Sequence, residues 1–143
     1  MELDWLQCRS QVNEILSIEN NLKNITQLIG EENLPEDQQL ILFIAKLIKE
    51  GFLIQNAFDD IDNYISTKKL LGQIKIILLL YKEAKELLTK GVIIEEIKDL
   101  ESLDDILRIS KSIPNEDFDK IIEIKENLIK EIKNLKRVYR GMK

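Results

Sequence analysis

The segment STKKLLGQIKIILLLYKEAKELLTKG, residues 66–91, decides the fold class of this chain. Its apolar residues recur every three or four positions, a spacing that places them on one face of an α-helix. Ser66 or Thr67 is expected to cap this helix. Gly91 is expected to end it, because glycine adopts the left-handed cap conformation without a steric cost. The predicted buried stripe consists of Leu70, Ile74, Ile77, Tyr81, Ala84 and Leu88.

The centre of this segment, residues 74–81, is the most apolar run of the chain. Lys75 interrupts the run and Lys82 stops it, so it is far shorter than the roughly 20 residues that a membrane-spanning helix needs. The first residues, MELDW, also lack the basic start and apolar run of a signal peptide. We therefore expect a buried core helix and no direct membrane insertion.

Two helices are predicted within residues 1–51. The first covers residues 4–29, with Asp4 as its N-cap and Gly30 as its end, and its apolar stripe is Ile15, Ile18, Leu22, Ile25 and Ile29. In the acidic loop that follows, Pro35 suits the first position of the second helix, where its missing N–H would be unpaired anyway. That helix is expected to reach Gly51 through Leu40, Ile41, Ile44, Leu47 and Ile48.

The remaining segments are also predicted to be helical. Residues 59–62 have the acidic start of a short helix, and short helices are expected over residues 93–100 and 103–110. Pro114 is expected to start the last helix, whose inward residues are Phe118, Ile121, Leu128, Ile132, Leu135 and Val138. The predicted fold is all-α. It is an antiparallel helical bundle with long first, third and last helices and short helices between, forming a single domain over residues 1–143.

Composition fits such a domain and limits its chemistry. Of the 143 residues, 44% are hydrophobic and 33% charged, which is too apolar for a disordered chain. There is no histidine, so Ser-His-Asp triads, Cys-His dyads and His-ligated zinc are excluded. The single Cys8 excludes an internal disulfide. The phosphate-binding patterns G-x-x-x-x-G-K-[ST] and G-x-G-x-x-G do not occur.

Carboxylates are abundant, but their positions do not indicate a catalytic or metal site. The pairs lie at expected helix starts or between apolar positions, where helix caps and solvated faces explain them; they are Glu95 with Glu96, Asp104 with Asp105, and Glu116 with Asp117. We therefore predict no catalytic residue and no metal ligand.

The C-terminal segment carries the one basic bias of a chain whose net charge is −5. Glutamates are interleaved with its cations at helical spacing, which favours a solvated face over an RNA- or membrane-binding surface. Contact with an acidic partner surface is the alternative, and no nucleic acid is predicted as a partner. The cations are Lys125, Lys130, Lys133, Lys136, Arg137, Arg140 and Lys143.

Three aromatic residues, Phe52, Phe58 and Tyr64, are spaced as a core stripe would be. Phe58, however, follows Gln55 and Asn56, and these polar residues do not suit a core helix. An aromatic ring beside amides can stack on a nucleotide base and hydrogen-bond to it. Both interpretations, core stripe and base contact, are compatible with the pattern.

The sequence motif that contains these aromatic residues resembles a motif of a known protein family. FLIQNAFDDIDNY, residues 52–64, closely resembles F-L-Q-Q-N-A-F-D-x-V-D-T-Y of the catalytic A subunit (alpha chain) of V-type and archaeal A-type ATP synthases. LIGEENLP and LILFIAKLIKE, starting at residues 28 and 40, resemble that family's L-V-G-x-x-x-L-P and L-I-L-E-V-A-R-x-I-R-E. YKEA, GVIIEEI and IPNEDF, starting at residues 81, 91 and 113, agree with it in the same order. Ile54 departs from the family, which has a second glutamine there.

The resemblance implies that the chain is the C-terminal helical domain of a longer polypeptide, without its barrel and nucleotide-binding domains. The parent enzyme would couple ATP synthesis or hydrolysis to rotation of a central stalk and to ion transport. ATP or ADP and Mg²⁺ would be cofactors of the parent only, and the isolated domain is expected to be inactive. The implied location is cytoplasmic, in the head of an enzyme peripheral to the membrane.

The resemblance also implies two contact sites. Gln55 and Phe58 would form the adenine side of the nucleotide site. The loop after Gly30 would contact the rotor stalk through Glu31, Glu32, Asn33, Leu34, Pro35, Glu36 and Asp37. The implied partners are the parent's own nucleotide-binding domain, the B subunits of the catalytic hexamer and the central stalk. The alternative is a free-standing helical adaptor that binds other proteins.

Overall fold

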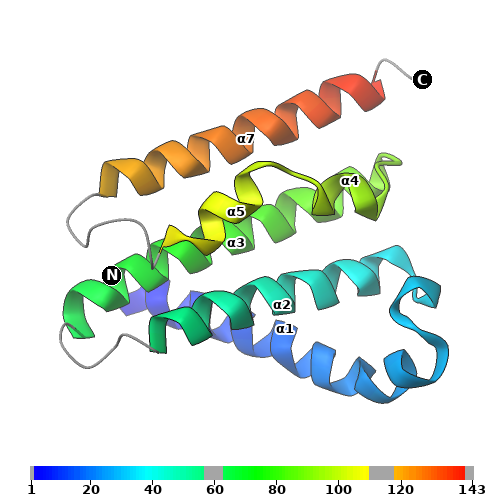
Figure 1. Ribbon diagram of the computed structural model, residues 1–143, viewed down its shortest axis with the longest axis horizontal. Helices are drawn as coiled ribbons and strands as arrows, with labels where there is room; N and C mark the ends of the chain where they lie inside the picture. The colour runs from blue at the N-terminus through cyan, green and yellow to red at the C-terminus, as the bar shows by residue number, and fades with distance from the viewer. Residues whose placement is uncertain (1, 57–62, 110–117, 141–143) are drawn as a thin grey trace.

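The structure, a computed structural model, describes residues 2–56, 63–109 and 118–140, with side chains for residues 6–50, 71–109 and 119–139. Every element in the described ranges is a helix, which confirms the all-α prediction (Figure 1). The long helices are α1 (Glu2–Ile29), α2 (Glu36–Asn56), α3 (Asn63–Thr89) and α7 (Phe118–Arg140). The short ones are the 3₁₀ helix η1 (Glu31–Asn33), α4 (Ile94–Lys98) and α5 (Ser102–Leu107).

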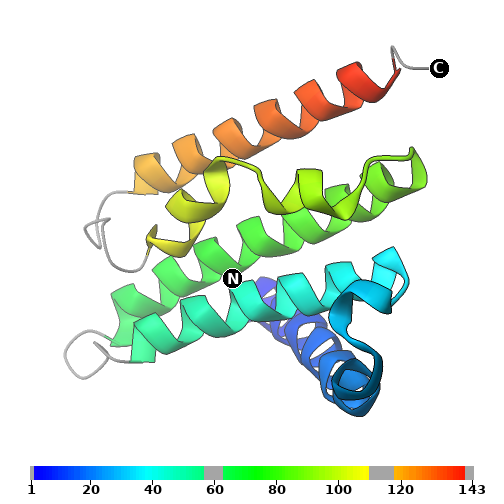
Figure 2. The ribbon, with the colours of Figure 1, turned by 45° about the vertical axis from the view of Figure 1, so that its right-hand side comes forward.

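Helix α3 is the centre of the bundle. It contacts α1, α2, α5 and α7, and Figures 1 and 2 show it between α2 on one side and α5 and α7 on the other. Because α3 has neighbours on several sides, its buried face is wider than the predicted stripe. Ile74, Ile77 and Ala84 are buried as predicted, whereas Tyr81 and Leu88 are only half-buried. Gln73, Ile76, Leu80 and Leu87, which are not part of the predicted stripe, are buried as well.

Helix α1 covers the bundle only over its first two thirds. Ile15 and Leu22 are buried and Ile18 is half-buried, but Ile25 and Ile29 are 46% and 47% exposed, so their predicted burial is wrong. Figure 2 shows the reason, since the C-terminal turns of α1 lie away from α3. The predicted N-cap is also wrong, because the helix already begins at Glu2.

Two glycines end helices as predicted. Gly30 and Gly91 have φ angles of +85° and +96°, which favour a residue without a Cβ atom. After α3, the Gly91 N–H donates to the Leu88 carbonyl at 3.1 Å and the Val92 N–H donates to the Leu87 carbonyl at 3.1 Å. This pair of bonds is a Schellman motif, and the buried Leu87 and Val92 provide its apolar contact.

Other predicted boundaries differ from the structure. Helix α2 runs past Gly51 to Asn56, because a glycine inside a well-packed helix costs only about 1 kcal/mol relative to alanine. Helix α3 begins at Asn63, so Ser66 and Thr67 lie inside it rather than capping it. Pro35 lies just before the first residue of α2, one position earlier in the helix than predicted. Its carbonyl accepts a hydrogen bond from the N–H of Gln39 at 3.0 Å.

Helix α7 packs one face against α3 and α5. Ile121, Leu128 and Ile132 are buried as predicted, and Leu135 is half-buried. Val138 is exposed, and Tyr139 packs against the core instead, because the inward face continues four residues after Leu135. The predicted start at Pro114 and the predicted short helix at residues 59–62 lie outside the described residues.

Candidate functional site

The turn between α1 and α2 is held by hydrogen bonds within the chain. Gly30 ends α1, and the N–H groups of Asn33 and Leu34 donate to the carbonyls of Gly30 and Glu31 at 3.3 and 3.1 Å. Gln39, which is buried on α2, donates from Nε2 to the Leu34 carbonyl at 2.7 Å. These bonds pair several polar backbone groups of the turn within the chain. We call residues 25–37 the α1–α2 tip.

Six of the seven predicted stalk-contact side chains of the tip are exposed, and Leu34 is 5% exposed. Leu34 therefore anchors the turn in the core. Two of the exposed carboxylates also contact α4. Glu36 Oε2 accepts from the N–H of Ile94 at 3.2 Å, and Glu31 Oε1 lies 3.6 Å from Lys98 Nζ. The tip is thus fixed to a second helix as well as to α2.

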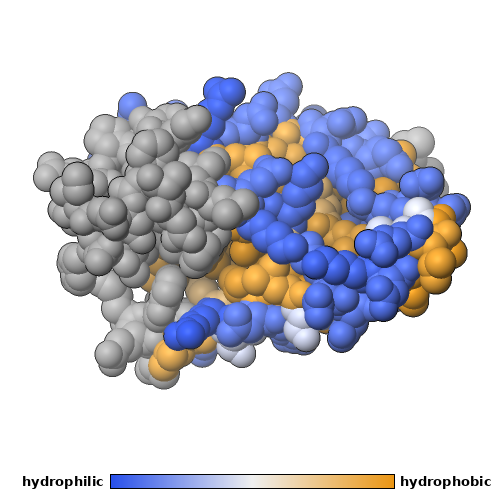
Figure 3. Space-filling model, turned by 60° about the horizontal axis from the view of Figure 1, so that its bottom comes forward, coloured by the Kyte–Doolittle hydropathy of each residue, from blue (hydrophilic) through white to orange (hydrophobic). Residues whose placement is uncertain are grey.

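An apolar patch adjoins these carboxylates, and sequence reasoning missed it. Leu28 is 83% exposed, next to the half-exposed Ile25 and Ile29. Figure 3 shows apolar surface among hydrophilic residues at the end of the molecule where Figure 1 places the turn from α1 to η1. Contiguous exposed apolar residues rimmed by polar ones are typical of protein contact sites. Leu28, which lies outside the predicted buried stripe, was the signal in the sequence that could have identified this patch.

The predicted adenine-side residues stay predictions. Gln55 lies in the last turn of α2, outside the ranges with described side chains, and Phe58 lies outside the described residues. Among the described residues, Gln55 and the predicted stalk-contact loop therefore lie at opposite ends of α2.

The carboxylate pairs that the sequence assigned to helix caps and solvated faces are exposed where the structure describes them. Glu95, Glu96, Asp104 and Asp105 lie in the first turns of α4 and α5. In the part of the chain described here, no group of three Cys, Asp or Glu side chains could hold a metal ion. Within the same ranges, no helix is long and apolar enough to cross a membrane.

The basic bias of α7 is partly compensated by glutamates of α3. Lys136 Nζ lies 2.8 Å from Glu83 Oε2 and 3.5 Å from Glu86 Oε2, and Lys90 pairs with Glu86 at 3.3 Å. The hydrogen bond to Glu83 raises the pKa of Lys136, and the hydrogen bond from Lys90 lowers the pKa of Glu86. These pairs support the interpretation of this region as a paired, solvated face.

Taken together, the described residues form an all-α bundle domain with one exposed tip that is both acidic and apolar. Comparison with known proteins places this bundle in a family. Residues 1–98 match the family described as the C-terminal domain of V and A type ATP synthase. The chain belongs to that family.

Curated relatives agree with this assignment. The V-type ATP synthase alpha chain of Halothermothrix orenii is 38% identical over 121 residues, which are 85% of this chain and 20% of the relative. The A subunit of the A-type ATP synthase of Methanopyrus kandleri is 41% identical over 133 residues, 92% of this chain and 22% of the relative. A V-type ATP synthase alpha chain of Clostridium tetani is 37% identical over 137 residues, 96% of this chain and 23% of the relative. The chain thus spans about one fifth of the length of these relatives.

Proposed function

We propose that this chain is the C-terminal domain of the catalytic subunit of a V- or A-type rotary ATP synthase, and that it couples events at the nucleotide site to rotation of the central stalk. The observation that carries the proposal is the course of α2. This helix begins at the α1–α2 tip and ends at Asn56, inside the segment that resembles the adenine-side motif. A single helix therefore joins the two proposed contact sites.

Helix α2 has the stiffness that such coupling needs. Its 21 residues span about 30 Å at 1.5 Å per residue. Leu40, Ile44 and Ala45 are completely buried, and α2 packs against both α1 and α3. A helix held in this way moves as part of a rigid body, because bending it would open a close-packed core. A small movement near Asn56 would reach the tip largely undiminished.

At the tip, the stalk would meet the exposed Leu28 with its apolar neighbours, and the carboxylates of Glu32 and Asp37. Leu34 supports this surface from inside, and Glu31 and Glu36 hold it to α4. Apolar contact provides affinity, whereas exposed charges chiefly orient the partner. Within the predicted stalk loop, three residues therefore support the tip, namely Glu31, Leu34 and Glu36. The side chains of the other residues of the loop face outward.

The nucleotide role of this chain is a supporting one. Stacking of an adenine on Phe58 would contribute roughly 1–3 kcal/mol, and even millimolar affinity needs about 4 kcal/mol. Contacts to phosphates and Mg²⁺ would come from the nucleotide-binding domain of the parent enzyme. The isolated chain therefore neither hydrolyses ATP nor binds it appreciably, and ATP, ADP and Mg²⁺ are ligands of the parent.

The proposed surroundings follow from the same assignment. The domain would contact its own nucleotide-binding domain, the B subunits and the central stalk, in the cytoplasmic head of an enzyme peripheral to the membrane. The relatives, which are ATP synthase alpha chains or A subunits, support a place in such an assembly.

The test uses the assembled enzyme. Leu28→Ser combined with Asp37→Ala is expected to lower torque on the stalk, measured by single-molecule rotation under load, without changing nucleotide affinity. Lys46→Ala, an exposed change in the middle of α2, is the control and should leave both quantities unchanged. Unchanged torque in the double variant would contradict the coupling role, whereas equal losses of torque and nucleotide affinity would point to misfolding.

A free-standing adaptor is the second candidate, since the apolar patch around Leu28 would also suit another partner. The parent gene separates the two functions. An upstream reading frame that continues into Glu2 and encodes G-x-x-x-x-G-K-[ST] supports the ATP synthase assignment. A gene product without that motif supports the adaptor.

A further inference from the structure

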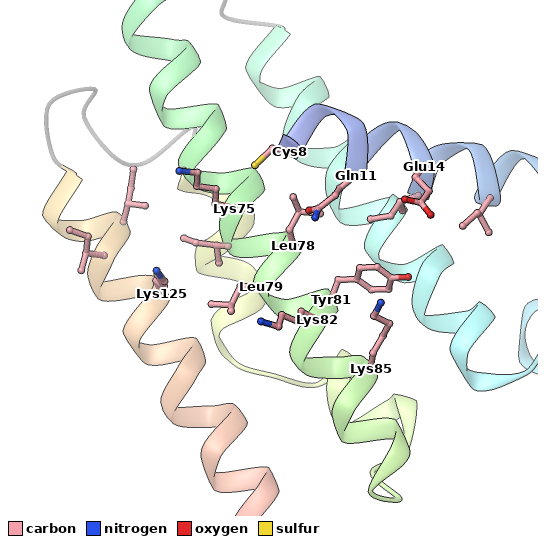
Figure 4. Close-up of a pocket in the computed structure, with 16 residues that line it drawn as sticks. Cys8, Gln11, Glu14, Lys75, Leu78, Leu79, Tyr81, Lys82, Lys85 and Lys125 are labelled. Carbon is pink, nitrogen blue, oxygen red and sulfur yellow. The ribbon is translucent and has the colours of Figure 1, made fainter. Parts of the chain in front are cut away.

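A groove runs between α1, α3 and α7. It has a volume of about 640 Å³ and is bordered by Gln11 of α1, Leu79 of α3 and Ile122 of α7 (Figure 4). Helices α1 and α7 both pack against α3, and the groove follows the strip of α3 between them. The strip begins at Gly72 and ends at Lys85.

The floor of the groove is apolar. Ile15 of α1 and Ile76 of α3 are buried beneath it, Leu79 is half-buried and Ile122 is exposed at its edge. At one end, a Cβ atom on Gly72 would lie 3.5 Å from the side chain of Ile121, so α3 and α7 approach each other closely there. Leu79 and Ile122 are thus apolar side chains of the groove that the described part of the chain leaves at least partly uncovered.

The charge at the rim is opposite to that of the whole protein. Among the described residues, Lys75, Lys82, Lys85 and Lys125 line the groove with Glu14 as the only lining carboxylate, although the chain carries a net charge of −5. All four lysines are exposed. Lys85 Nζ lies 4.5 Å from the centre of the Tyr81 ring.

The other three lysines form a frame around apolar side chains. Figure 4 shows Lys75 and Lys82 of α3 and Lys125 of α7 extending into the space between the two helices, with Leu79 between the α3 lysines. Lys75 and Lys82 are seven residues apart on one helix, which corresponds to two turns and about 10 Å. Carboxylates two turns apart on a facing helix have the same spacing.

We propose that this groove binds an acidic amphipathic helix of a protein partner. The apolar face of that helix would lie on Leu79 and Ile122, and glutamate or aspartate side chains on its flanks would pair with Lys75, Lys82 and Lys125. The strip from Gly72 to Lys85 accommodates about four turns of helix. This inference goes beyond the proposed rotary function and does not depend on it, because none of the residues that line the groove is proposed to contact the stalk or the nucleotide.

The experiment is a titration of the ¹⁵N-labelled chain with two synthetic helical peptides of about fifteen residues, followed by NMR. The first carries leucines on one face and glutamates on both flanks, and the second replaces every glutamate by glutamine. The acidic peptide is expected to shift the amides of residues 72–85 and 121–125 and to bind roughly tenfold more tightly than the neutral one, since several exposed ion pairs are lost together. Added salt should reduce that difference.

Two matched variants test the contribution of the lysine frame. The first variant should lose the preference for the acidic peptide; it combines Lys75→Glu, Lys82→Glu and Lys125→Glu. The control variant combines Lys23→Glu, Lys46→Glu and Lys130→Glu, which change the net charge by the same amount at exposed lysines outside the groove. It should retain the preference for the acidic peptide. Circular dichroism verifies that both variants are folded. Equal binding of the two peptides, shifts outside the groove, or displacement of the peptide by a second copy of the chain or by anionic vesicles would overturn the proposal.

Discussion

The carboxylate of Glu36 accepts a hydrogen bond from the backbone N–H of Ile94 at 3.2 Å, which joins the first turn of α2 to the first turn of α4. The two residues are 58 positions apart in the chain. The N–H of Ile94 is among the four at the start of α4 that have no partner within their own helix, and the negative charge of Glu36 also suits the positive end of the helix dipole. Glu36 therefore stabilises the fold, in agreement with its proposed role as a support of the tip.

Replacing Glu36 by alanine is expected to lower the free energy of unfolding by about 1 kcal/mol, because the substitution removes a carboxylate cap from α4. Urea denaturation followed by circular dichroism measures the change. Glu36→Gln should lose less, since the amide oxygen can still accept from Ile94. Lys46→Ala, at an exposed position of the same helix, provides the baseline for a surface substitution. Identical midpoints for all three variants would show that the cap is not formed in solution.

Glu131 of α7 caps the start of α5, as Glu36 caps α4, but it accepts more hydrogen bonds. Its carboxylate accepts from the N–H of Glu101 at 2.8 Å, from the N–H of Ser102 at 3.1 Å and from the Ser102 hydroxyl. Glu131→Ala is therefore expected to cost about 2 kcal/mol, more than loss of the Glu36 cap. A double-mutant cycle with Ser102→Ala should give a favourable coupling energy, since the hydroxyl bond is counted in both single variants. Strict additivity of the two losses would contradict direct pairing.

The helical periodicity of the sequence was enough to predict the fold class and the order of the helices. It was not enough to predict how wide each buried face is. On α3, Leu80 and Leu87 are completely buried because neighbours pack on several sides, a tertiary fact that the 3.6-residue period does not contain. On α1, the same period continues to Ile29 although the packing partner does not.

The candidate site was predictable in place but not in detail. The loop after Gly30 was found from a family resemblance, and its exposed carboxylates are consistent with contact to a partner. That Leu34 points inward and that Glu36 caps α4 could not be predicted, because both depend on contacts with distant segments. A single apolar residue in a loop gives the same sequence pattern whether it packs into the core or contacts a partner.

Stability is expected to fall at strongly alkaline pH. Burial, together with the charges of Glu14 and Asp37, raises the pKa of Tyr81 above its ordinary 10.0, and the hydrogen bond to Glu83 raises the pKa of Lys136 above 10.5. A group whose pKa is higher in the folded state stabilises the fold fully below its unfolded pKa and loses that contribution as the pH rises through the folded pKa. Both groups therefore predict a loss of stability above about pH 10.

Urea denaturation between neutral pH and about pH 11 measures this loss, and absorbance at the phenolate band follows ionisation of the tyrosines. Tyr81→Phe should remove part of the alkaline dependence because phenylalanine does not ionise. Tyr139→Phe is the matched control, at another half-buried tyrosine. If both variants retain the full alkaline dependence, Tyr81 is not its source.

The two leucines of the α1–α2 tip are expected to respond in opposite ways. Leu34 is 5% exposed, so Leu34→Ala leaves a cavity and should lower the free energy of unfolding by about 2–3 kcal/mol. Leu28 is 83% exposed, so Leu28→Ala should change stability by less than about 0.5 kcal/mol. In the assembled enzyme, Leu28→Ala should nevertheless weaken retention of the central stalk, measured by native mass spectrometry. A stable Leu34→Ala variant would mean that the turn is not anchored by this side chain, and an unchanged stalk with Leu28→Ala would remove the apolar patch from the proposed contact.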